Sequence, residues 1–261
     1  MLDKIRAFNR SRLINRIKNK APVRTPHGFN FIGPVAMLQG EFERDETNFL
    51  ISKLTSCTSF LNIGANYGYY CCHAQKLGVK TVAIEPVPIN CGILMENMKI
   101  NGWGDNITLL PIAAGNNSGF IDIYGEGTGA SIIRGWARNP NSLSATVSIA
   151  KVDEIINPSA LGEELLVLID VEGFEYNVLL GAEKLISSNN KKITWLIEIL
   201  LKEHSPNKNR NYVDTFNIFF KEGYKAFDVN ELSKEILIDD VLRWVETGSF
   251  EEANNNFVFH K

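Results

Sequence analysis

Short apolar runs alternate with longer segments of helical periodicity along the chain from residue 58 onward. Strands are expected over residues 59–63, 81–84 and 107–112, and helices over residues 69–77 and 89–100. Most of these segments end at a glycine, at a proline or at an Asn-Gly pair, and the connections are short. Strands that alternate with helices in this way form a parallel sheet covered on both faces. The sequence therefore predicts an α/β fold with a doubly wound, mostly parallel sheet.

The second half of the chain resumes this pattern after a long segment without clear periodicity. A strand is expected over residues 120–124 and a long loop over residues 125–144, and loops of this length in a compact domain are usually functional. Residues 165–169 are all apolar, so this strand is expected to be buried on both faces. The remaining expected elements are helices over 176–187 and 212–220, a strand over 193–198, and a closing antiparallel pair over 225–229 and 256–259.

The first 24 residues carry an excess of positive charge that the rest of the chain lacks. They hold eight lysines and arginines against Asp3 alone, and the remainder carries 19 basic and 29 acidic side chains. An acidic body argues against nucleic-acid binding. Apolar positions at helical spacing between residues 2 and 19 predict a basic helical arm, which divides the chain into an arm (1–40) and a domain (41–261). The arm could contact a membrane surface or another subunit, or pack on the acidic body.

The sequence shows no strong targeting or metal-binding signal. No apolar run approaches the roughly 20 residues that cross a bilayer, and the N-terminus lacks the apolar stretch of a secretory signal. The four cysteines have no CxxC spacing and the four histidines form no HExxH pair, so we predict no structural metal site. These features favour a cytoplasmic protein with no transmembrane segment, in which the thiols are free and buried.

Two motifs lie in the first expected strand-helix-strand unit, one after each of its strands. Residues 62–68 read Asn-Ile-Gly-Ala-Asn-Tyr-Gly and lie between the first strand and the first helix, where glycines let the backbone approach a ligand. Glu85 ends the second strand and is followed by Pro86, and an acidic residue at this place can accept both hydroxyls of a ribose. A plain turn and a solvated strand end are the alternatives. Because one strand-helix-strand unit sets the spacing between the two motifs, the motifs together favour a nucleoside-binding site.

A third motif places three carboxylates after the most apolar strand. Asp170, Glu172 and Glu175 follow Ile169 within six residues, at the sheet edge where open α/β sheets bind ligands. Carboxylates that lie close together repel one another, which destabilises the fold unless a ligand, a metal or a proton compensates their charge. The alternative is that Glu172 and Glu175 only favour the N-terminus of the next helix. That alternative explains Glu175 better than Asp170.

Taken in order, five segments resemble the FkbM family of S-adenosylmethionine-dependent methyltransferases. The segments read FLNIGANYGYY, IEP, PIAAG, LIDVEGFEYNVLLGA and IEI, and the resemblance covers roughly residues 40–230. It implies a class I methyltransferase (Rossmann-like) fold, S-adenosyl-L-methionine as methyl donor with S-adenosyl-L-homocysteine as product, and methylation of a hydroxyl oxygen. Two positions depart from the family's usual pattern: Asn62 stands where the family commonly has Asp, and Leu168 where it often has Lys.

The resemblance also implies which residues contact the cofactor. The glycine turn would wrap its methionine end, Glu85 would hold the ribose hydroxyls, and Asp170 would face the transferred methyl group. Ala113 and Ala114, after the third strand, would lie near the adenine. The complete expected set is Asn62, Gly64, Ala65, Asn66, Gly68, Glu85, Pro86, Ala113, Ala114 and Asp170.

Methylation of a hydroxyl calls for a base within hydrogen-bond reach, because a protonated hydroxyl attacks poorly. The candidates are Asp170, Glu172 and His204, which follows the strand that ends in IEI. A metal-assisted variant is less favoured: Asp170, Glu172 and Glu198 could supply oxygen ligands for Mg²⁺. In both variants the protein aligns the nucleophile with an already activated methyl group.

Two other functions remain open at this point. A nicotinamide-dependent oxidoreductase shares the fold and Glu85, and a nucleoside-cofactor-binding scaffold would keep the fold without methyl transfer. The expected acceptor is a small molecule or a glycan, with its hydroxyl on a sugar, a glycan or a secondary metabolite. The loop over residues 125–144, with Arg134, Trp136 and Arg138, is the segment expected to select it. Trp136 could stack on a sugar ring or cover the core.

Overall fold

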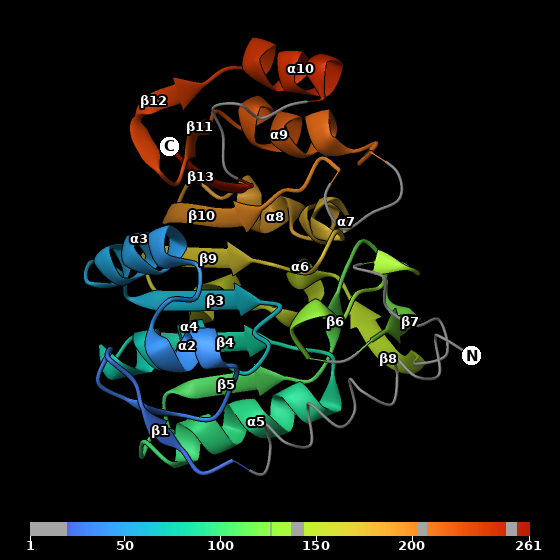
Figure 1. Ribbon diagram of the computed structural model, residues 1–261. Helices are drawn as coiled ribbons and strands as arrows, with labels where there is room; N and C mark the ends of the chain where they lie inside the picture. Colours follow the sequence, from blue (N-terminus) through green and yellow to red (C-terminus); the bar gives the residue numbers. More distant parts are fainter. Residues whose placement is uncertain (1–19, 126, 137–143, 203–207, 249–254) are drawn as a thin grey trace.

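An eight-stranded sheet runs through the centre of the molecule (Figure 1). The computed structural model describes residues 20–125, 127–136, 144–202, 208–248 and 255–261, so the helical arm expected between residues 2 and 19 lies outside the described residues. The strands follow the order β12-β11-β13-β10-β9-β3-β4-β5. Their bounds are β3 Ser59–Ile63, β4 Lys80–Ile84, β5 Ile107–Leu110, β9 Glu164–Ile169, β10 Lys192–Glu198, β11 Lys225–Asp228, β12 Glu231–Ile236 and β13 Asn256–His260.

The direction of the strands confirms the α/β prediction. Strands β5, β4, β3, β9 and β10 are parallel neighbours, and β13 enters antiparallel between β10 and β11. The sheet is therefore mostly parallel, and its last strand is antiparallel, as expected for a class I methyltransferase fold. The expected pairing of residues 225–229 with 256–259 is present as the β11–β13 ladder.

Alternate residues of the central strands pack on opposite faces of the sheet. Leu165, Val167 and Ile169 join the apolar cluster beneath helices α7, α8 and α9, whereas Leu166 and Leu168 join the cluster beneath α3, α4 and α5. Burial of both faces explains why residues 165–169 of β9 are all apolar. The helices of the two layers are α3 Arg44–Leu54, α4 Tyr69–Lys76 and α5 Pro88–Lys99 on one face, and α7 Glu175–Leu180, α8 Glu183–Ile186, α9 Tyr212–Lys221 and α10 Ile238–Thr247 on the other.

The single helix expected over residues 176–187 is wrong, because two short helices occupy this segment. Helix α7 ends at Leu180 and α8 begins at Glu183. Between them, Gly181 lies against the backbone of Gly115, where an added Cβ would stand 1.9 Å from the carbonyl oxygen. Asp153 accepts hydrogen bonds from the backbone amides of Lys184 and Leu185 and so begins the second helix.

A smaller, three-stranded sheet stands at the carboxyl ends of the parallel strands (Figure 1). Its order is β6-β8-β7, with β6 Ala113–Ala114, β7 Gly119–Tyr124 and β8 Ser144–Ala150. The strand expected over 107–112 ends early at Leu110, and β6 then joins this second sheet. Strand β8 was not anticipated from the sequence, because it follows directly on the segment interpreted as a long loop. Short elements complete the region: η1 Gly127–Gly129, α6 Val152–Ile155 and η3 Pro158–Ala160.

Residues 20–40 pack against the main body of the protein. They form a hairpin of β1 Val23–Arg24 and β2 Asn30–Phe31, followed by α2 Val35–Gln39. Phe29 and Phe31 are fully buried, and the Asn97 amide on α5 bonds both the N–H and the C=O of Ile32. The division of the chain at residue 40 stays a prediction. Among the described residues, every helix is too short or too polar to traverse a lipid bilayer.

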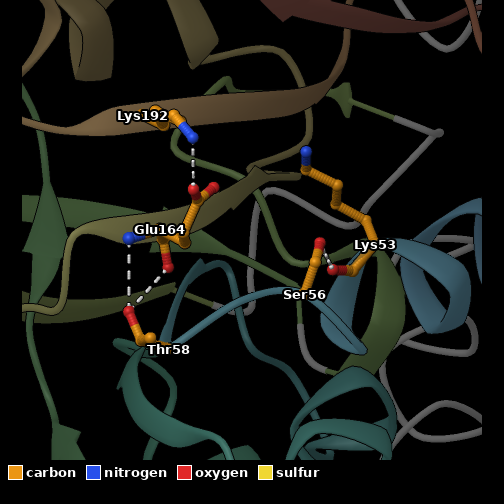
Figure 2. A network of polar contacts seen from close by, with 5 residues as sticks. All are labelled: Lys53, Ser56, Thr58, Glu164 and Lys192. Atoms are coloured by element: carbon orange, nitrogen blue, oxygen red, sulfur yellow. Dashed lines mark hydrogen bonds and ion pairs between the residues drawn. The ribbon is translucent and has the colours of Figure 1, made fainter.

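Side-chain contacts at the amino ends of the strands fix the register between β3 and β9. Figure 2 shows Thr58 hydrogen-bonded through its hydroxyl to the backbone of Glu164, at 3.0 Å from the carbonyl oxygen and 3.2 Å from the amide. The Glu164 carboxylate pairs with Lys192 of β10 at 2.9 Å. In this register Ile63 lies opposite Ile169. The residues that follow these two strands, Gly64 and Asp170, therefore meet at the opposite edge of the sheet.

Candidate functional site

The carboxyl ends of β3, β4 and β9 and the second sheet enclose a cavity of about 580 Å³, which we call the first cavity. Side chains from the glycine turn, from the turn after β4 and from the turn after β9 form its polar wall. Residues of β6, of β7 and of the segment between β7 and β8 complete the lining and make part of it apolar. The lining comprises Ile63, Gly64, Asn66, Ile84, Glu85, Pro86, Val87, Asn90, Ala113, Ala114, Ile123, Gly127, Thr128, Ala130, Ser131, Ile132, Asp170, Val171 and Glu172.

The glycine turn has the form that the sequence predicted. Gly64 has a φ of +86°, and a Cβ atom on it would lie 1.8 Å from the carbonyl oxygen of Asp170. Only glycine combines this left-handed backbone with so close an approach of two chain segments. Gly68 has a φ of +79° and directly precedes α4. The two glycines thus allow β3 to turn sharply into the helix while the turn stays against β9.

Glu85 is buried at the end of β4, with 4% of its surface exposed. Its Oε2 accepts a hydrogen bond from the backbone amide of Asn66 at 2.8 Å, and its Oε1 accepts from the amide of Val87 at 2.9 Å and from Asn90 Nδ2 at 3.2 Å. Burial raises the pKa of Glu85 to about 7, although these hydrogen bonds oppose the shift. Each carboxylate oxygen can accept two hydrogen bonds, so Oε2 retains one open position.

Asn90 is a site residue that the sequence analysis did not single out. It lines the first cavity, is 1% exposed, and its Oδ1 has no hydrogen-bond partner among the described residues. A buried acceptor without a partner is costly unless a ligand donates to it. In the sequence, only its position five residues after Glu85 and near the start of a helix could have indicated a site residue. This position alone does not distinguish Asn90 from other polar residues at the start of a helix.

The turn after β9 is held by its own carboxylates and by the loop that follows β7. Glu175 Oε1 accepts from the amide of Gly173 at 2.8 Å, and Glu172 has a left-handed backbone with φ of +55°. Trp136 is buried against Gly173, and its indole N–H donates to the Glu172 carboxylate. The tryptophan therefore packs on this turn and is not exposed as a loop residue would be.

A second cavity, of about 1020 Å³, adjoins the first one. Gly64, Asn66, Thr128, Asp170 and Glu172 line both cavities, so these residues mark their junction. No lysine or arginine of the described residues lines either cavity. The second cavity is lined by Met37, Phe42, Glu43, Gly64, Ala65, Asn66, Tyr69, Tyr70, Thr128, Gly129, Asp170, Glu172 and Glu198.

Backbone strain concentrates at the second cavity. Within the described residues, three that are not glycine have a left-handed backbone: Glu43, Asn66 and Glu172. All three line this cavity. Residues other than glycine, asparagine and aspartate rarely adopt this conformation, and such outliers cluster at active sites and ligand clamps.

Glu43, which immediately precedes α3, was not a candidate in the sequence analysis. Its carboxylate accepts a hydrogen bond of 2.5 Å from the hydroxyl of Tyr70. Burial raises the pKa of Glu43 to about 8, and the charge of Asp170 adds to the rise. Glu43 precedes every motif that was recognised, so only the folded structure brings it to the site.

Asp170 directly follows β9 and Glu198 ends β10, so the parallel register of these strands makes the two residues neighbours at the edge of the sheet. Burial raises the pKa of Asp170 to about 6. The pKa of Glu198 rises well above its usual range, first through burial and then through the charge of Asp170. The second oxygen of Asp170, Oδ1, is buried and without a partner among the described residues.

Most of the expected cofactor-contacting residues come together, but not all of them line the first cavity. Ala65 lines only the second cavity, and Asn62 and Gly68 line neither. Asn62 is 1% exposed and points its amide nitrogen at Cys71 Sγ, 3.4 Å away. His204 lies outside the described residues. In the part of the chain that the structure describes, no group of three or more His, Cys, Asp or Glu side chains is arranged to hold a metal ion.

Comparison with known proteins gives a family match and several distant structural similarities. The family described as the methyltransferase FkbM domain matches residues 62–226. A crystal structure of methyltransferase FkbM from Methylobacillus flagellatus KT shares 16% identity and has a TM-score of 0.48, over 78% of this chain. The chain spans 44% of the length of that protein. No curated protein matches the chain.

Two further solved structures are similar over most of both chains. Precorrin-6y C5,15-methyltransferase from Geobacter metallireducens GS-15 shares 12% identity, with a TM-score of 0.46 over 88% of this chain and 95% of that one. A putative O-methyltransferase from Klebsiella pneumoniae shares 10% identity, with a TM-score of 0.45 over 100% and 98% of the two chains.

Proposed function

Because this chain belongs to the family of the methyltransferase FkbM domain, we propose that it transfers a methyl group from S-adenosyl-L-methionine to a hydroxyl oxygen. The acceptor hydroxyl belongs to a sugar, a glycan or a secondary metabolite, and the product of the donor is S-adenosyl-L-homocysteine. The single observation that carries this proposal is the junction of the two cavities at Asp170. One cavity takes the donor and the other takes the acceptor.

The first cavity suits a nucleoside donor. Glu85 Oε2 has one open acceptor position, and Asn90 Oδ1 is a buried acceptor that lacks a partner. Together they provide two acceptors for the two hydroxyls of a ribose. This differs from the expectation that Glu85 alone binds both hydroxyls, because three donors of the protein already use most of its capacity.

The remaining walls of the first cavity suit the two ends of the donor. Ala113 and Ala114 are small and buried, and together with Ile84 and Ile123 they offer an apolar surface for the adenine. Gly64 and Asn66 line the other end, where the chain approaches closely and a methionine moiety fits. Asn62 and Gly68 then act by shaping the turn and the start of α4 rather than by contact.

The second cavity suits an uncharged or cationic acceptor rather than an anionic one. Its carboxyl groups come from Glu43, Asp170, Glu172 and Glu198, and no described lysine or arginine lines it. Carboxyl groups accept hydrogen bonds from hydroxyls when ionised and donate when protonated. A phosphate or a carboxylate in this place would add another negative charge to the cluster.

Asp170 is the proposed base. Its Oδ1 is free to accept a proton, whereas the Glu172 carboxylate already accepts the indole N–H of Trp136. When bound, the donor supplies a methyl group on a positively charged sulfur. The protein aligns the acceptor oxygen with that group and takes the proton of the hydroxyl. His204 stays a candidate from the sequence alone, and a role for Mg²⁺ is not supported by a metal-binding arrangement of the described residues.

A transfer experiment tests the proposal directly. The protein is incubated with donor that carries a ¹³C-labelled methyl group and with a panel of sugars, glycans and hydroxylated metabolites, and the label is followed by NMR. Methoxy signals from a hydroxyl acceptor support the proposal. Labelled N-methyl products would replace hydroxyl transfer with amine transfer. Donor binding without any transfer would favour the scaffold, and binding of NAD in place of the donor would favour the oxidoreductase.

Two proposals concern the cellular setting of the enzyme. We propose that it acts in the cytoplasm, where the free thiols of Cys71, Cys72 and Cys91 stay reduced. Packing of the basic segment over residues 1–24 on the acidic body is one proposal, and contact of this segment with a membrane surface or a second subunit is the alternative. Deletion of residues 1–20 should then change vesicle binding or oligomeric mass, more at low salt than at high salt, and leave donor affinity nearly intact.

A further inference from the structure

The second cavity carries more carboxyl groups than the donor alone calls for. Asp170 and Glu172 line both cavities, so they lie beside the place proposed for the sulfonium of the donor. Glu43 and Glu198 line only the second cavity, and no described lysine or arginine lines it. Neighbouring carboxylates repel one another unless a positive charge offsets them. The two carboxyl groups that the donor does not reach therefore call for a positive charge on the acceptor.

Glu43 is oriented by a hydrogen bond that leaves half of its carboxylate for a ligand. Its Oε2 accepts from the hydroxyl of Tyr70 at 2.5 Å. Its Oε1 makes no hydrogen bond within the described residues, although Glu43 lines the cavity. Because the hydroxyl proton of Tyr70 is already given to Glu43, this tyrosine cannot also donate to a ligand.

Tyr69 gives a second, independent indication that a ligand binds here. It lines the second cavity and is 2% exposed, and its hydroxyl has no hydrogen-bond partner among the described residues. A buried hydroxyl without a partner destabilises the fold unless a ligand completes it. The hydroxyl oxygen can accept a hydrogen bond from an N–H group of a ligand.

Three aromatic rings meet in one wall of the second cavity. The ring centroids of Phe42, Tyr69 and Tyr70 lie 5.5 to 6.2 Å apart, and the ring planes are inclined to one another by 51° to 82°. The faces of aromatic rings attract organic cations, and such cations bind best where several rings adjoin. Aromatic rings beside carboxyl groups are therefore suited to an organic ammonium group.

The hydrogen-bonding capacity of the lining favours the same kind of ligand. Its side chains include four carboxyl groups, which only accept hydrogen bonds when they are ionised. An ammonium group brings three donors and no acceptor, whereas each hydroxyl of a neutral sugar brings acceptors as well as a donor. An ammonium group thus matches the acceptors of this cavity more closely than a further hydroxyl does.

We propose that the second cavity binds an organic ammonium group, so that the acceptor is a hydroxylated amine such as an amino sugar, an amino cyclitol or an amino alcohol. This inference rests on the proposed function and deepens it by naming the class of acceptor. Glu43 and Tyr69 determine the specificity by binding the ammonium group. This group has no lone pair and cannot attack the methyl group, so the hydroxyl beside Asp170 remains the nucleophile.

Binding of matched probes tests the inference without any turnover. Amino sugars, amino cyclitols and amino alcohols are each paired with the counterpart in which a hydroxyl replaces the amine. Their affinities for the full-length protein are measured by saturation-transfer NMR at pH 7, with S-adenosyl-L-homocysteine present. In at least one pair we expect the amine to bind about fivefold more tightly or better. A smaller preference in every pair would overturn the proposal.

Two variants and a control assign the preference to named residues. Glu43→Gln keeps an oxygen for the Tyr70 hydroxyl but loses its charge, and Tyr69→Phe keeps the ring but loses the hydroxyl. Each should reduce the preference for the amine at least about threefold and leave binding of the hydroxyl counterpart nearly unchanged. Glu41→Gln removes an exposed charge two residues before Glu43 that lines neither cavity, and it should keep the preference.

Two results would contradict this assignment. One is a preference for the amine that survives in both Glu43→Gln and Tyr69→Phe. The other is an equal loss in Glu41→Gln and Glu43→Gln, since this would mean that only the overall charge of the region attracts the amine. The affinity of each variant for S-adenosyl-L-homocysteine shows that the variant is folded.

The outcomes also separate this inference from the proposed function. If labelled methyl groups reach hydroxyls of neutral acceptors and no amine is preferred, the ammonium inference fails alone. If amines are preferred but the label appears on nitrogen, transfer to a hydroxyl fails while the ammonium site stands. If amines are preferred and no donor binds, the cavity binds amines but the proposed function fails.

Discussion

The backbone amide of Asn66 donates a hydrogen bond of 2.8 Å to Glu85 Oε2. This bond joins the glycine turn after β3 to the acidic residue after β4, so the two motifs form one unit. Asn66 adopts a left-handed backbone to point its amide at the carboxylate. Its side-chain Oδ1 then accepts from the amide of Tyr67 at 2.8 Å, which stabilises the turn before α4.

Removal of the Glu85 carboxylate should weaken donor binding. Glu85→Ala is expected to reduce the affinity for S-adenosyl-L-methionine by about 2 to 3 kcal/mol, because a charged acceptor is lost and the amides of Asn66 and Val87 lose their partner. Calorimetric titration measures the change. Glu96→Ala, an exposed position on the following helix, is the matched control. An unchanged dissociation constant for Glu85→Ala would remove the ribose assignment.

A methyl group at Gly64 should destabilise the fold strongly. Gly64→Ala places its Cβ 1.8 Å from the Asp170 carbonyl oxygen on a left-handed backbone, so the two chain segments must separate. We expect a loss of more than about 3 kcal/mol in the free energy of unfolding. Gly78→Ala has a similar φ of +73° but meets no atom within 4 Å, so it should cost only about 1 to 2 kcal/mol. Urea denaturation of both variants decides, and equal losses would show that the close approach is unimportant.

The parts of the fold that were predictable from the sequence are those set by local patterns. The apolar run 165–169 predicted a buried strand, and the glycine turn that ends at Gly68 marked the start of a helix. Strand β8 was missed because its serine and threonine residues resemble those of the loop before it. Gly181 was taken as part of a helix because its close contact with the backbone of Gly115 is a tertiary feature.

The site residues show the same difference between local patterns, which the sequence reveals, and tertiary contacts, which it does not. Glu85 and Asp170 were found because each directly follows a strand, where a parallel sheet places its ligands. Glu43 and Asn90 were missed because their importance comes from the neighbours they meet: Tyr70 and Asp170 for Glu43, and Glu85 for Asn90. Glu198 was considered only as a metal ligand, since its place beside Asp170 depends on the register of β9 and β10.

The contact of Trp136 with the turn after β9 should contribute to stability. Trp136→Phe keeps an aromatic ring against Gly173 but removes the N–H that donates to Glu172. We expect the free energy of unfolding to fall by about 1 to 3 kcal/mol, as for a buried hydrogen bond to a charged group. Trp103→Phe, in the aromatic cluster with Phe29, is the comparison and should cost less. If Trp103→Phe destabilised the protein more than Trp136→Phe in thermal denaturation, this role of Trp136 would be contradicted.

The raised pKa values predict how stability depends on pH. Burial raises the pKa of Glu43 to about 8, and those of Glu85 and Glu175 to about 7, all above the value of 4.5 for an unperturbed glutamate. Between pH 4.5 and pH 8 these three carboxyl groups bind more protons in the folded protein than in the unfolded chain, so their contribution to stability falls as pH rises. Burial lowers the pKa of His73 to about 3, which opposes this trend below about pH 6.5.

We expect the free energy of unfolding of the ligand-free protein to be roughly 2 to 5 kcal/mol lower at pH 8 than at pH 5, after allowance for solvent screening. Urea denaturation at a series of pH values measures this slope. Glu175→Gln, which keeps an oxygen for the Gly173 amide, should flatten it, whereas Glu96→Gln should not. Stability that increases steadily from pH 5 to pH 8 would contradict the account.

Neutralisation of Asp170 should abolish most of the turnover and leave the donor bound. Asp170→Asn keeps the volume of the side chain but cannot take the acceptor proton, so turnover is expected to fall about 10²- to 10⁴-fold. Donor affinity should change little, because the contacts proposed for Glu85 and Asn90 remain. Both quantities are measured on the same preparation. Turnover within tenfold of the original would transfer the role of base to Glu172 or His204.

The most direct test of the central claim is an equilibrium titration of the full-length protein with S-adenosyl-L-methionine and, separately, with NAD. The account predicts saturable binding of one S-adenosyl-L-methionine per chain and no measurable binding of NAD. Saturable binding of NAD, or no binding of S-adenosyl-L-methionine, would contradict it.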